Sequence, residues 1–461
     1  KVYKKYSHKK KALVYSRTFK KDETKELFIY GLGGDDHFEI FGNAYSGAKI
    51  RVIGGDGNDV FNDISSVYGA SKRTFIYDVT TGTVIKPGKE TKVYTSDKDY
   101  QVNEYKRFRF KPDIVAPIVI LGFNVDDGLK IGGGVSIKKH GWRKTPYSSW
   151  QKISAAYASN TGAIKFDYDA DFNQLIKKWS LFVNAHVLAP NNSTNFYGLG
   201  NETVAIDPKS EYYQLNFDRF KLSALFGRQI SEHHKFKMGP SYEYIQIINT
   251  SDKFITSPSA NINASELRET GFMGFNFNYE INTQDENSLK KKGIKWNLNA
   301  DWLNNTSENT FLSVIHSEFI FTRQFKFPFQ PIISSRLGGT TIFGKFNFYQ
   351  ASSLGGQNKE MEKGNIRGYH RDRYSGRSVA YHNTDLRLQF FKIKSYLFPG
   401  AVGVLGFVDY GKVWNNENSK IWHNSYGGGV WLDIMNKVTL VASYEESTDG
   451  SFFTFRTKFL F

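Results

Sequence analysis

Two Gly/Asp turns near the amino end contain the residue types that could bind a metal ion. Residues 54–62 read GGDGNDVFN and match the calcium-binding repeat G-G-x-G-x-D-x-U-x at every defined position. Residues 31–39 read GLGGDDHFE and depart from that repeat only at Leu32. Glycine permits a left-handed backbone in such a turn, and aspartate supplies the hard oxygen ligands that calcium prefers. The candidate calcium ligands are Asp36, Asp56 and Asp59.

The spacing of the two turns argues against a shared ion. Asp36 and Asp59 are 23 residues apart, whereas a calcium β-roll stacks nonapeptide repeats. The alternative is that both turns close hairpins without a metal, and the balance favours it slightly. We therefore expect at most weak calcium affinity and no other cofactor.

Other residue types that support catalysis are scarce. The 461 residues include no Cys, which excludes disulfides, Cys-ligated zinc, iron–sulfur clusters and thiol nucleophiles. The motifs G-x-S-x-G, H-E-x-x-H and G-x-x-x-x-G-K-[ST] do not occur. The sequence therefore predicts no enzymatic activity.

Charge and composition narrow the class of protein further. The formal net charge is +16, and aromatic residues make up 16% of the chain. So many large side chains exclude a disordered chain, and no stretch approaches the ~20 apolar residues of a membrane-spanning helix. The charge suggests an anionic partner, either nucleic acid or a lipid surface. The basic opening, residues 1–25, lacks the aromatic interleaving of a nucleic-acid groove, so we interpret it as a solvated charge run and expect no nucleic acid.

The elements that must position these residues are strands. From Ile114 to Phe461, large apolar residues alternate with small or polar ones over segments of about ten residues, which is the period of a β-strand. Sixteen such segments occur, and the long connections follow the fifth, seventh and eleventh, at 188–210, 248–267 and 345–378. Long loops on one side and an even strand number are typical of an outer-membrane barrel, whereas an open sheet of this size would expose its edges.

The sequence therefore predicts an all-β protein. Residues 113–461 are expected to form a 16-stranded antiparallel transmembrane β-barrel, and residues 1–112 a small β-rich segment that precedes it. A soluble propeller is the alternative, but we find no blade repeat of about 40–45 residues. No secretory signal opens the chain, so we interpret it as mature or as a fragment without its natural start.

Four motifs follow one another along the second half of the chain. They are LGG at 354–356, NIRGY at 365–369, GFVDYG at 406–411 and GGGVWLD at 427–433, and the last strand ends on Phe461. In this order they resemble the BamA/TamA superfamily of 16-stranded outer-membrane proteins, also called the bacterial surface antigen family. FYGLGN at 196–201 resembles a further segment of that family. The resemblance covers about residues 114–461.

The resemblance implies that the long loop folds back into the barrel. In that family the Arg of the R-G-F/Y tip meets an acidic residue on strand thirteen, and the matching residues here are Arg367, Gly368, Tyr369, Asp409 and Gly411. An Arg inside the lumen needs a carboxylate to offset its desolvation, and a glycine in the wall leaves room for the loop. An ordinary extracellular-loop Arg is the alternative.

The amino end departs from the family pattern. Family members usually carry periplasmic POTRA domains, each a β-α-α-β-β unit, but residues 1–112 contain no convincing helix pair. Some Bacteroidota members of the superfamily instead place a calcineurin-like metallophosphoesterase before a Gly/Asp-rich β segment and the barrel, and residues 26–63 resemble that segment. The phosphoesterase motif G-N-H-[DE] is absent from this chain.

The resemblance implies an integral outer-membrane barrel of a Gram-negative bacterium with a periplasmic amino-terminal segment. It would assist insertion, assembly or translocation of client polypeptides through a seam between residues 117–123 and the last strand, with anionic lipid, lipopolysaccharide and lipoproteins as further partners. The expected seam residues of the last strand are Phe453, Phe455, Phe459 and Phe461. One alternative is a barrel that anchors a periplasmic metallophosphoesterase or a partner complex without insertase activity, and another is a passive pore.

Overall fold

The computed structural model describes residues 1–461 except 8–9, 21, 70, 99–101, 106–110, 125–126, 206–209, 249–250, 286–291, 357–363, 417, 436–437 and 458. The chain divides into two compact units, Lys1–Lys111 and Pro112–Phe461. Each unit has its own sheets, so each is described by itself.

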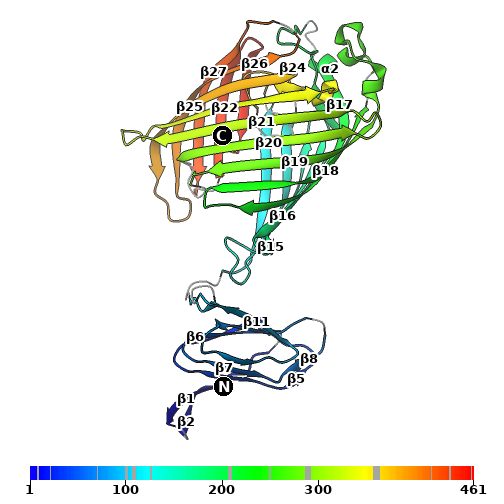
Figure 1. The fold of residues 1–461 in the computed structure, drawn as a ribbon. Helices are drawn as coiled ribbons and strands as arrows, with labels where there is room; N and C mark the ends of the chain where they lie inside the picture. Colours follow the sequence, from blue (N-terminus) through cyan, green and yellow to red (C-terminus); the bar gives the residue numbers. More distant parts are fainter. Residues whose placement is uncertain are drawn as a thin grey trace. The chain divides into compact units, whose positions relative to one another are not determined.

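The larger unit is a closed barrel of sixteen antiparallel strands, and the predicted fold class is confirmed (Figure 1). In barrel order the strands are β12 (Ile114–Asn124), β13 (Gly128–Lys139), β14 (Ser149–Ala158), β15 (Ile164–Ile176), β16 (Trp179–Asn195), β17 (Gln214–Gln229), β18 (His234–Ile248), β19 (Thr270–Asn282), β20 (Gly293–Asn305), β21 (Phe311–Gln324), β22 (Ile332–Gly344), β25 (Ser378–Ile393), β26 (Gly400–Trp414), β27 (His423–Ile434), β28 (Val438–Ser447) and β29 (Gly450–Arg456).

The alternation in the sequence separates two faces of this wall. On β26, Asp409 points inward and is fully buried, while its neighbours Val408 and Tyr410 are 41% and 45% exposed on the outside. An apolar outer face with polar residues inside is the pattern of a barrel that meets lipid. Within the described residues, no helix has the length and apolar character needed to cross a bilayer.

Long connections gather at one end of the barrel, which we call the long-loop end; the opposite end is the short-turn end. The long loops carry α2 (Ser210–Tyr213), η1 (Phe254–Thr256), η2 (Pro258–Ala260), η3 (Ala264–Leu267), η4 (Phe348–Gln350), β23 (Ser352–Leu354) and β24 (Tyr374–Gly376). Aromatic residues of three loops, including Phe196, Phe254 and Phe348, pack into one cluster there. The predicted loop 188–210 starts later than expected, because β16 continues past a bulge and pairs Asn192–Asn195 with β17.

The smaller unit contains a parallel β-solenoid. It has three parallel sheets. The first contains β3 (Glu26–Gly33), β6 (Lys49–Asp56), β9 (Thr74–Val79) and β11 (Thr91–Ser96). The second contains β4 (His37–Ile40), β7 (Val60–Asp63) and β10 (Val84–Lys86), and the third contains β5 (Asn43–Ala44) and β8 (Ser66–Val67). The basic opening, interpreted as a solvated run, forms the antiparallel pair β1 (Val2–Ser7) and β2 (Lys10–Tyr15).

The solenoid explains the 23-residue spacing of the Gly/Asp turns. Glu26 pairs with Lys49 and His37 with Val60, so one coil is 23 residues long and each turn lies over its counterpart in the next coil. The hairpin alternative is wrong, because the strands around these turns pair in parallel. Val52, Phe61 and Ile76 form the core between the sheets, and Phe38 stacks on Phe61 at 4.8 Å between ring centroids.

Candidate functional site

The guanidinium of Arg367 lies inside the barrel against the wall. Its Nε and Nη2 donate to Oδ2 and Oδ1 of Asp409 at 2.7 and 2.6 Å, and its backbone N–H donates to the same carboxylate at 3.0 Å. Nη2 also lies 2.8 Å from Oδ1 of Asp385 on β25. The guanidinium carbon is 3.6 Å from the centroid of the Phe407 ring. A bidentate pair with two carboxylates compensates the burial of this cation.

The two residues after Arg367 fasten the loop to the last strands. Gly368 has φ +72°, a conformation that glycine adopts without strain, and its N–H donates to Oε2 of Glu445 on β28 at 3.0 Å. The Tyr369 hydroxyl donates to the backbone carbonyl of Asn424 on β27 at 2.9 Å. The tip therefore contacts four different strands of the wall, β25 to β28.

Gly411 gives the loop room, as its place in the wall implies. A Cβ added there would lie 2.3 Å from Cδ1 of Leu354, which belongs to the loop and is fully buried. Leu354 packs with Ile366 and Tyr369 in one hydrophobic cluster. A side chain at position 411 would displace this packing.

Sequence reasoning missed the other charged residues of the site. Asp385 bonds to Arg387 as well as Arg367, at 2.9 Å, and Glu445 accepts from Arg456 at 2.7 Å. Arg336 on β22 donates to Asn383 at 2.8 Å and to the Gly364 carbonyl of the loop at 2.7 Å. A charged residue at an inward position of an alternating strand was the available signal, but alternation alone does not tell which inward residues meet.

The seam between the first and last strands is weakly paired. Among the described residues, β12 and β29 share one residue pair, Phe123 with Phe455. By contrast, β12 shares eleven pairs with β13, and β28 shares seven with β29. On the edge of β12, Val119 is 72% exposed.

The chain beyond β29 turns into the lumen. The predicted last strand, 452–461, ends at Arg456, and residue 458 lies outside the described residues. Phe459 lies against Trp431 with ring centroids 5.9 Å apart, and Phe461 is 6% exposed beside Ile320. Phe453 alone keeps a largely exposed ring on the outer face, at 57%. The four predicted seam aromatics therefore divide between the outer face, the pair with β12 and the lumen.

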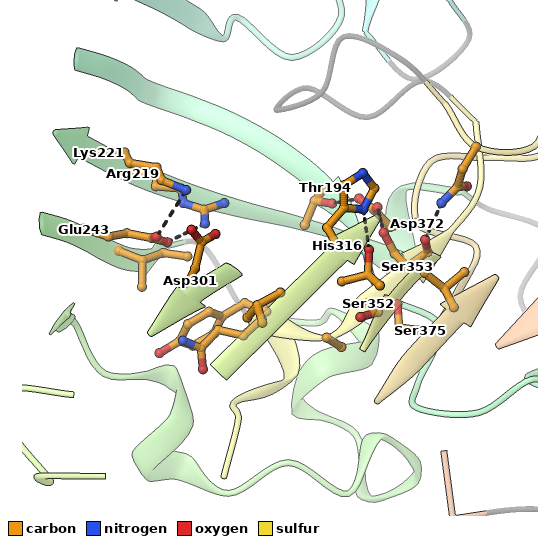
Figure 2. Close-up of a pocket in the computed structure, with 18 of the residues that line it drawn as sticks. Thr194, Arg219, Lys221, Glu243, Asp301, His316, Ser352, Ser353, Asp372 and Ser375 are labelled. Atoms are coloured by element: carbon orange, nitrogen blue, oxygen red, sulfur yellow. Dashed lines mark hydrogen bonds and ion pairs between the residues drawn. The ribbon is translucent and has the colours of Figure 1, made fainter. Parts of the chain in front are cut away.

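Behind the loop, the lumen contains a cavity of about 720 Å³ (Figure 2). Its lining is mixed in charge: Arg219 pairs with Glu243, and Lys221 lies 3.9 Å from the same carboxylate. Asp372 of the long loop accepts hydrogen bonds from Thr194 and Ser353. Compensated charges of this kind suit a hydrated lumen.

The solenoid brings Asp36 and Asp59 together but leaves Asp56 exposed on the outside. The N–H of Asp36 donates to Oδ1 of Asp59 at 2.8 Å, and Oδ2 of Asp59 packs with Oδ2 of Asp78 over Gly54. Burial raises the pKa of Asp59 to about 6, and the nearby Asp78 and Asp36 carboxylates add to that rise. The described residues contain no cluster of three or more acidic or His side chains suited to a metal, so calcium binding stays a prediction.

Comparison with known proteins gives a family model and several similar folds. The model described as the Omp85 superfamily domain matches residues 152–434, more than half of the chain. The fold is similar to the crystal structure of BamA from Haemophilus ducreyi lacking POTRA domains 1-3, with TM-score 0.51, 14% sequence identity, and 81% of this chain and 72% of that chain covered.

Two further structures are similar at lower scores. CdiB from Acinetobacter baumannii has TM-score 0.43 and 13% identity, with 74% of this chain and 59% of that chain covered. CdiB from Escherichia coli has TM-score 0.46 and 11% identity, with 80% and 66% covered. A search of curated protein sequences finds no significant match.

Proposed function

Because the chain belongs to the Omp85 superfamily, we propose that its barrel lies in the bacterial outer membrane and helps to insert, assemble or translocate other polypeptides. The client is an extended polypeptide segment that reaches the seam between β12 and β29. It pairs there with exposed backbone by strand addition, which needs no nucleotide and tolerates many sequences.

The weak seam is the observation that carries this proposal. One residue pair joins β12 to β29 among the described residues, so most of the β12 edge is available to another strand. Continuing the Phe123–Phe455 register, Val119 would face Phe459 and Pro117 would face Phe461. Phe461 is instead buried in the lumen and Phe459 packs on Trp431, which supports a barrel whose wall opens at this place.

The contact of Arg367 with Asp409 has a positioning role in this proposal. It holds the long loop inside the barrel, so that the loop limits the free passage of solutes while the seam stays accessible. The loop also disfavours a passive pore. Its residues Leu354 and Ile366 are fully buried against residues of the barrel wall, so the loop is fixed inside the barrel.

We place the smaller unit in the periplasm within the same proposal. Its chain continues into β12 at the short-turn end, and short turns of outer-membrane barrels face the periplasm. The net charge of +16 supports anionic lipid and lipopolysaccharide phosphates as partners. Lipoprotein partners are part of the proposal through the family resemblance.

A second candidate is a barrel that anchors a periplasmic metallophosphoesterase or a partner complex without inserting clients. The solenoid favours it, because parallel coils stand where the family usually has POTRA domains. The two candidates differ in one respect: an insertase needs its seam to open, whereas an anchor does not.

Disulfide trapping separates the two candidates. The chain has no Cys, so Phe123→Cys with Phe455→Cys creates a single possible bridge across the seam. Leu121→Cys with Ile131→Cys is the matched control, because it bridges the fully paired strands β12 and β13. If only the seam bridge stops assembly of other outer-membrane proteins in cells, the insertase stands. Normal assembly with a locked seam refutes it and leaves the anchor.

A further inference from the structure

Two arginines beyond the Arg-Gly-Tyr tip reach opposite sides of the seam. Arg371 Nη2 lies 2.5 Å from Oδ2 of Asp127, in the connection between β12 and β13. Arg373 Nε lies 2.9 Å from Oδ1 of Asp449, in the turn between β28 and β29. One loop segment therefore contacts the first hairpin and the last hairpin at the long-loop end.

The Arg371 contact is buried and the Arg373 contact is largely buried, and both arginines have further partners. Arg371 is 2% exposed and Asp127 4%, and Arg371 also donates to the Ser193 carbonyl of β16 at 2.8 Å. Arg373 is 6% exposed, and its guanidinium carbon lies 4.7 Å from the centroid of the Tyr197 ring. Removing one partner of a buried pair leaves an uncompensated charge, so such pairs restrain their elements more than exposed pairs do.

Both contacts lie next to the ends of the seam strands. Asp127 directly precedes Gly128, which pairs with Asn124 at the end of β12, and Asp449 directly precedes Gly450, the first residue of β29. Because β12 and β29 share a single residue pair among the described residues, backbone pairing alone gives their ends little hold on each other. The loop supplies that hold instead.

We propose that Arg371 and Arg373 form a clamp that keeps the long-loop end of the seam closed. Arg371 holds the first hairpin, Arg373 holds the last, and the Arg367 contact with Asp409 fixes the segment that carries both. Both are positioning residues. The inference rests on the proposed function, because a clamp matters to a barrel whose seam opens; releasing either arm frees the long-loop end of the seam while the rest of the wall stays paired.

The test measures seam separation in the full chain, purified and reconstituted in a phosphatidylcholine/phosphatidylglycerol bilayer without client. Spin labels at Leu121→Cys and Phe453→Cys report on the seam through dipolar broadening of the EPR spectrum, since both side chains lie on the outer face near it. Labels at Phe275→Cys and Trp302→Cys, on the paired strands β19 and β20, report on the ordinary wall.

Arg371→Gln and Asp449→Asn each remove one arm, and Asp449→Glu keeps the carboxylate. We expect the first two to abolish the broadening across the seam and the third to retain it, with the wall labels unchanged in all. Glu308→Gln breaks the exposed loop pair with Lys345 and removes one negative charge, as Asp449→Asn does. This control should alter neither signal.

Unchanged seam broadening in both Arg371→Gln and Asp449→Asn would overturn the clamp, as would an equal loss of broadening in the wall labels. Arg371 is buried, so a variant that fails to fold would leave the first arm without a reading. Asp449 lies in a turn, so Asp449→Asn tests the second arm separately. Because no client is present, failure of the clamp leaves the insertase proposal standing, and that proposal fails separately if cells with a locked seam assemble their proteins normally.

Discussion

The guanidinium carbon of Arg387 lies 3.9 Å from the centroid of the Phe459 ring inside the barrel. Phe459 shares the residue parity of Phe453, whose ring is on the outer face, so a straight last strand would direct it to lipid. The cation–π contact and packing against Trp431 instead favour the inward turn. The same turn leaves the β12 edge uncovered, so the tail and the seam are one structural feature.

Loss of the tail contacts should let the tail pair with β12. We expect Phe459→Ala with Phe461→Ala to weaken the inward state by about 1–2 kcal/mol, because both rings lie near arginines. Leu121→Cys and Thr457→Cys, which the register places opposite each other, should then cross-link roughly tenfold faster. An unchanged rate would contradict a competition between the two tail positions.

The Arg367 contact should dominate the stability of the loop inside the barrel. Arg367→Ala leaves the buried Asp409 carboxylate without its partner and should cost about 3–5 kcal/mol of unfolding free energy. Asp409→Ala should cost less, because the guanidinium then still pairs with Asp385. The double variant should lose much less unfolding free energy than the two single variants together, because both charges of the pair are then removed. Urea unfolding in detergent measures this coupling, with exposed Arg323→Ala as the control; additive losses would rule out the pair.

Gly411 should be intolerant of a side chain for a steric reason that can be reversed. Gly411→Ala brings a Cβ to 2.3 Å from Cδ1 of Leu354, so we expect destabilisation and loosening of the loop. Leu354→Ala in the same chain removes the clash, and the double variant should be more stable than the sum predicts. Gly122→Ala, where a Cβ meets nothing within 4 Å, should change thermal unfolding little. If the two destabilisations simply add, the clash with Leu354 is not their cause.

The stacked carboxylates of the solenoid should make it less stable at neutral pH than in mild acid. The pKa of Asp59 is raised to about 6 from an ordinary value of 3.8, so the folded state binds this proton more tightly than the unfolded state. Its contribution to stability therefore falls as pH rises from about 4 to about 6 and stays low above that. Hydrogen exchange of the β6 amides should be slower at pH 5 than at pH 7.5 after correction for intrinsic rates.

Two changes test this origin of the pH dependence. Asp59→Asn should slow exchange at pH 7.5 and flatten the profile, whereas exposed Asp56→Asn should do neither. From the predicted weak affinity, added calcium should slow exchange only slightly at pH 7.5. No effect at all would contradict the predicted calcium binding, and strong protection would show an affinity higher than predicted.

Local patterns in the sequence determined the strand content, the sixteen-strand barrel and the side that bears the long loops. Alternation of side chains is a property of neighbouring residues, so it is readable without the fold. The same pattern misplaced Phe459 and Phe461, because parity assumes that the strand continues. Arg367 and Asp409 belong to the family motifs and were predicted to meet, whereas Asp385, Glu445 and Arg336 lie outside those motifs and were not predicted.

Only the tertiary structure decided which charges meet across the lumen and how the Gly/Asp turns are stacked. Arg371 and Asp127 are 244 residues apart, and their contact depends on closure of the whole barrel and on the path of the loop inside it. Asp36 and Asp59 lie in successive coils because their strands pair in parallel, which the turn sequences did not reveal. Local sequence sets the periodicity of each strand, whereas its partners are selected by the burial and pairing of the complete chain.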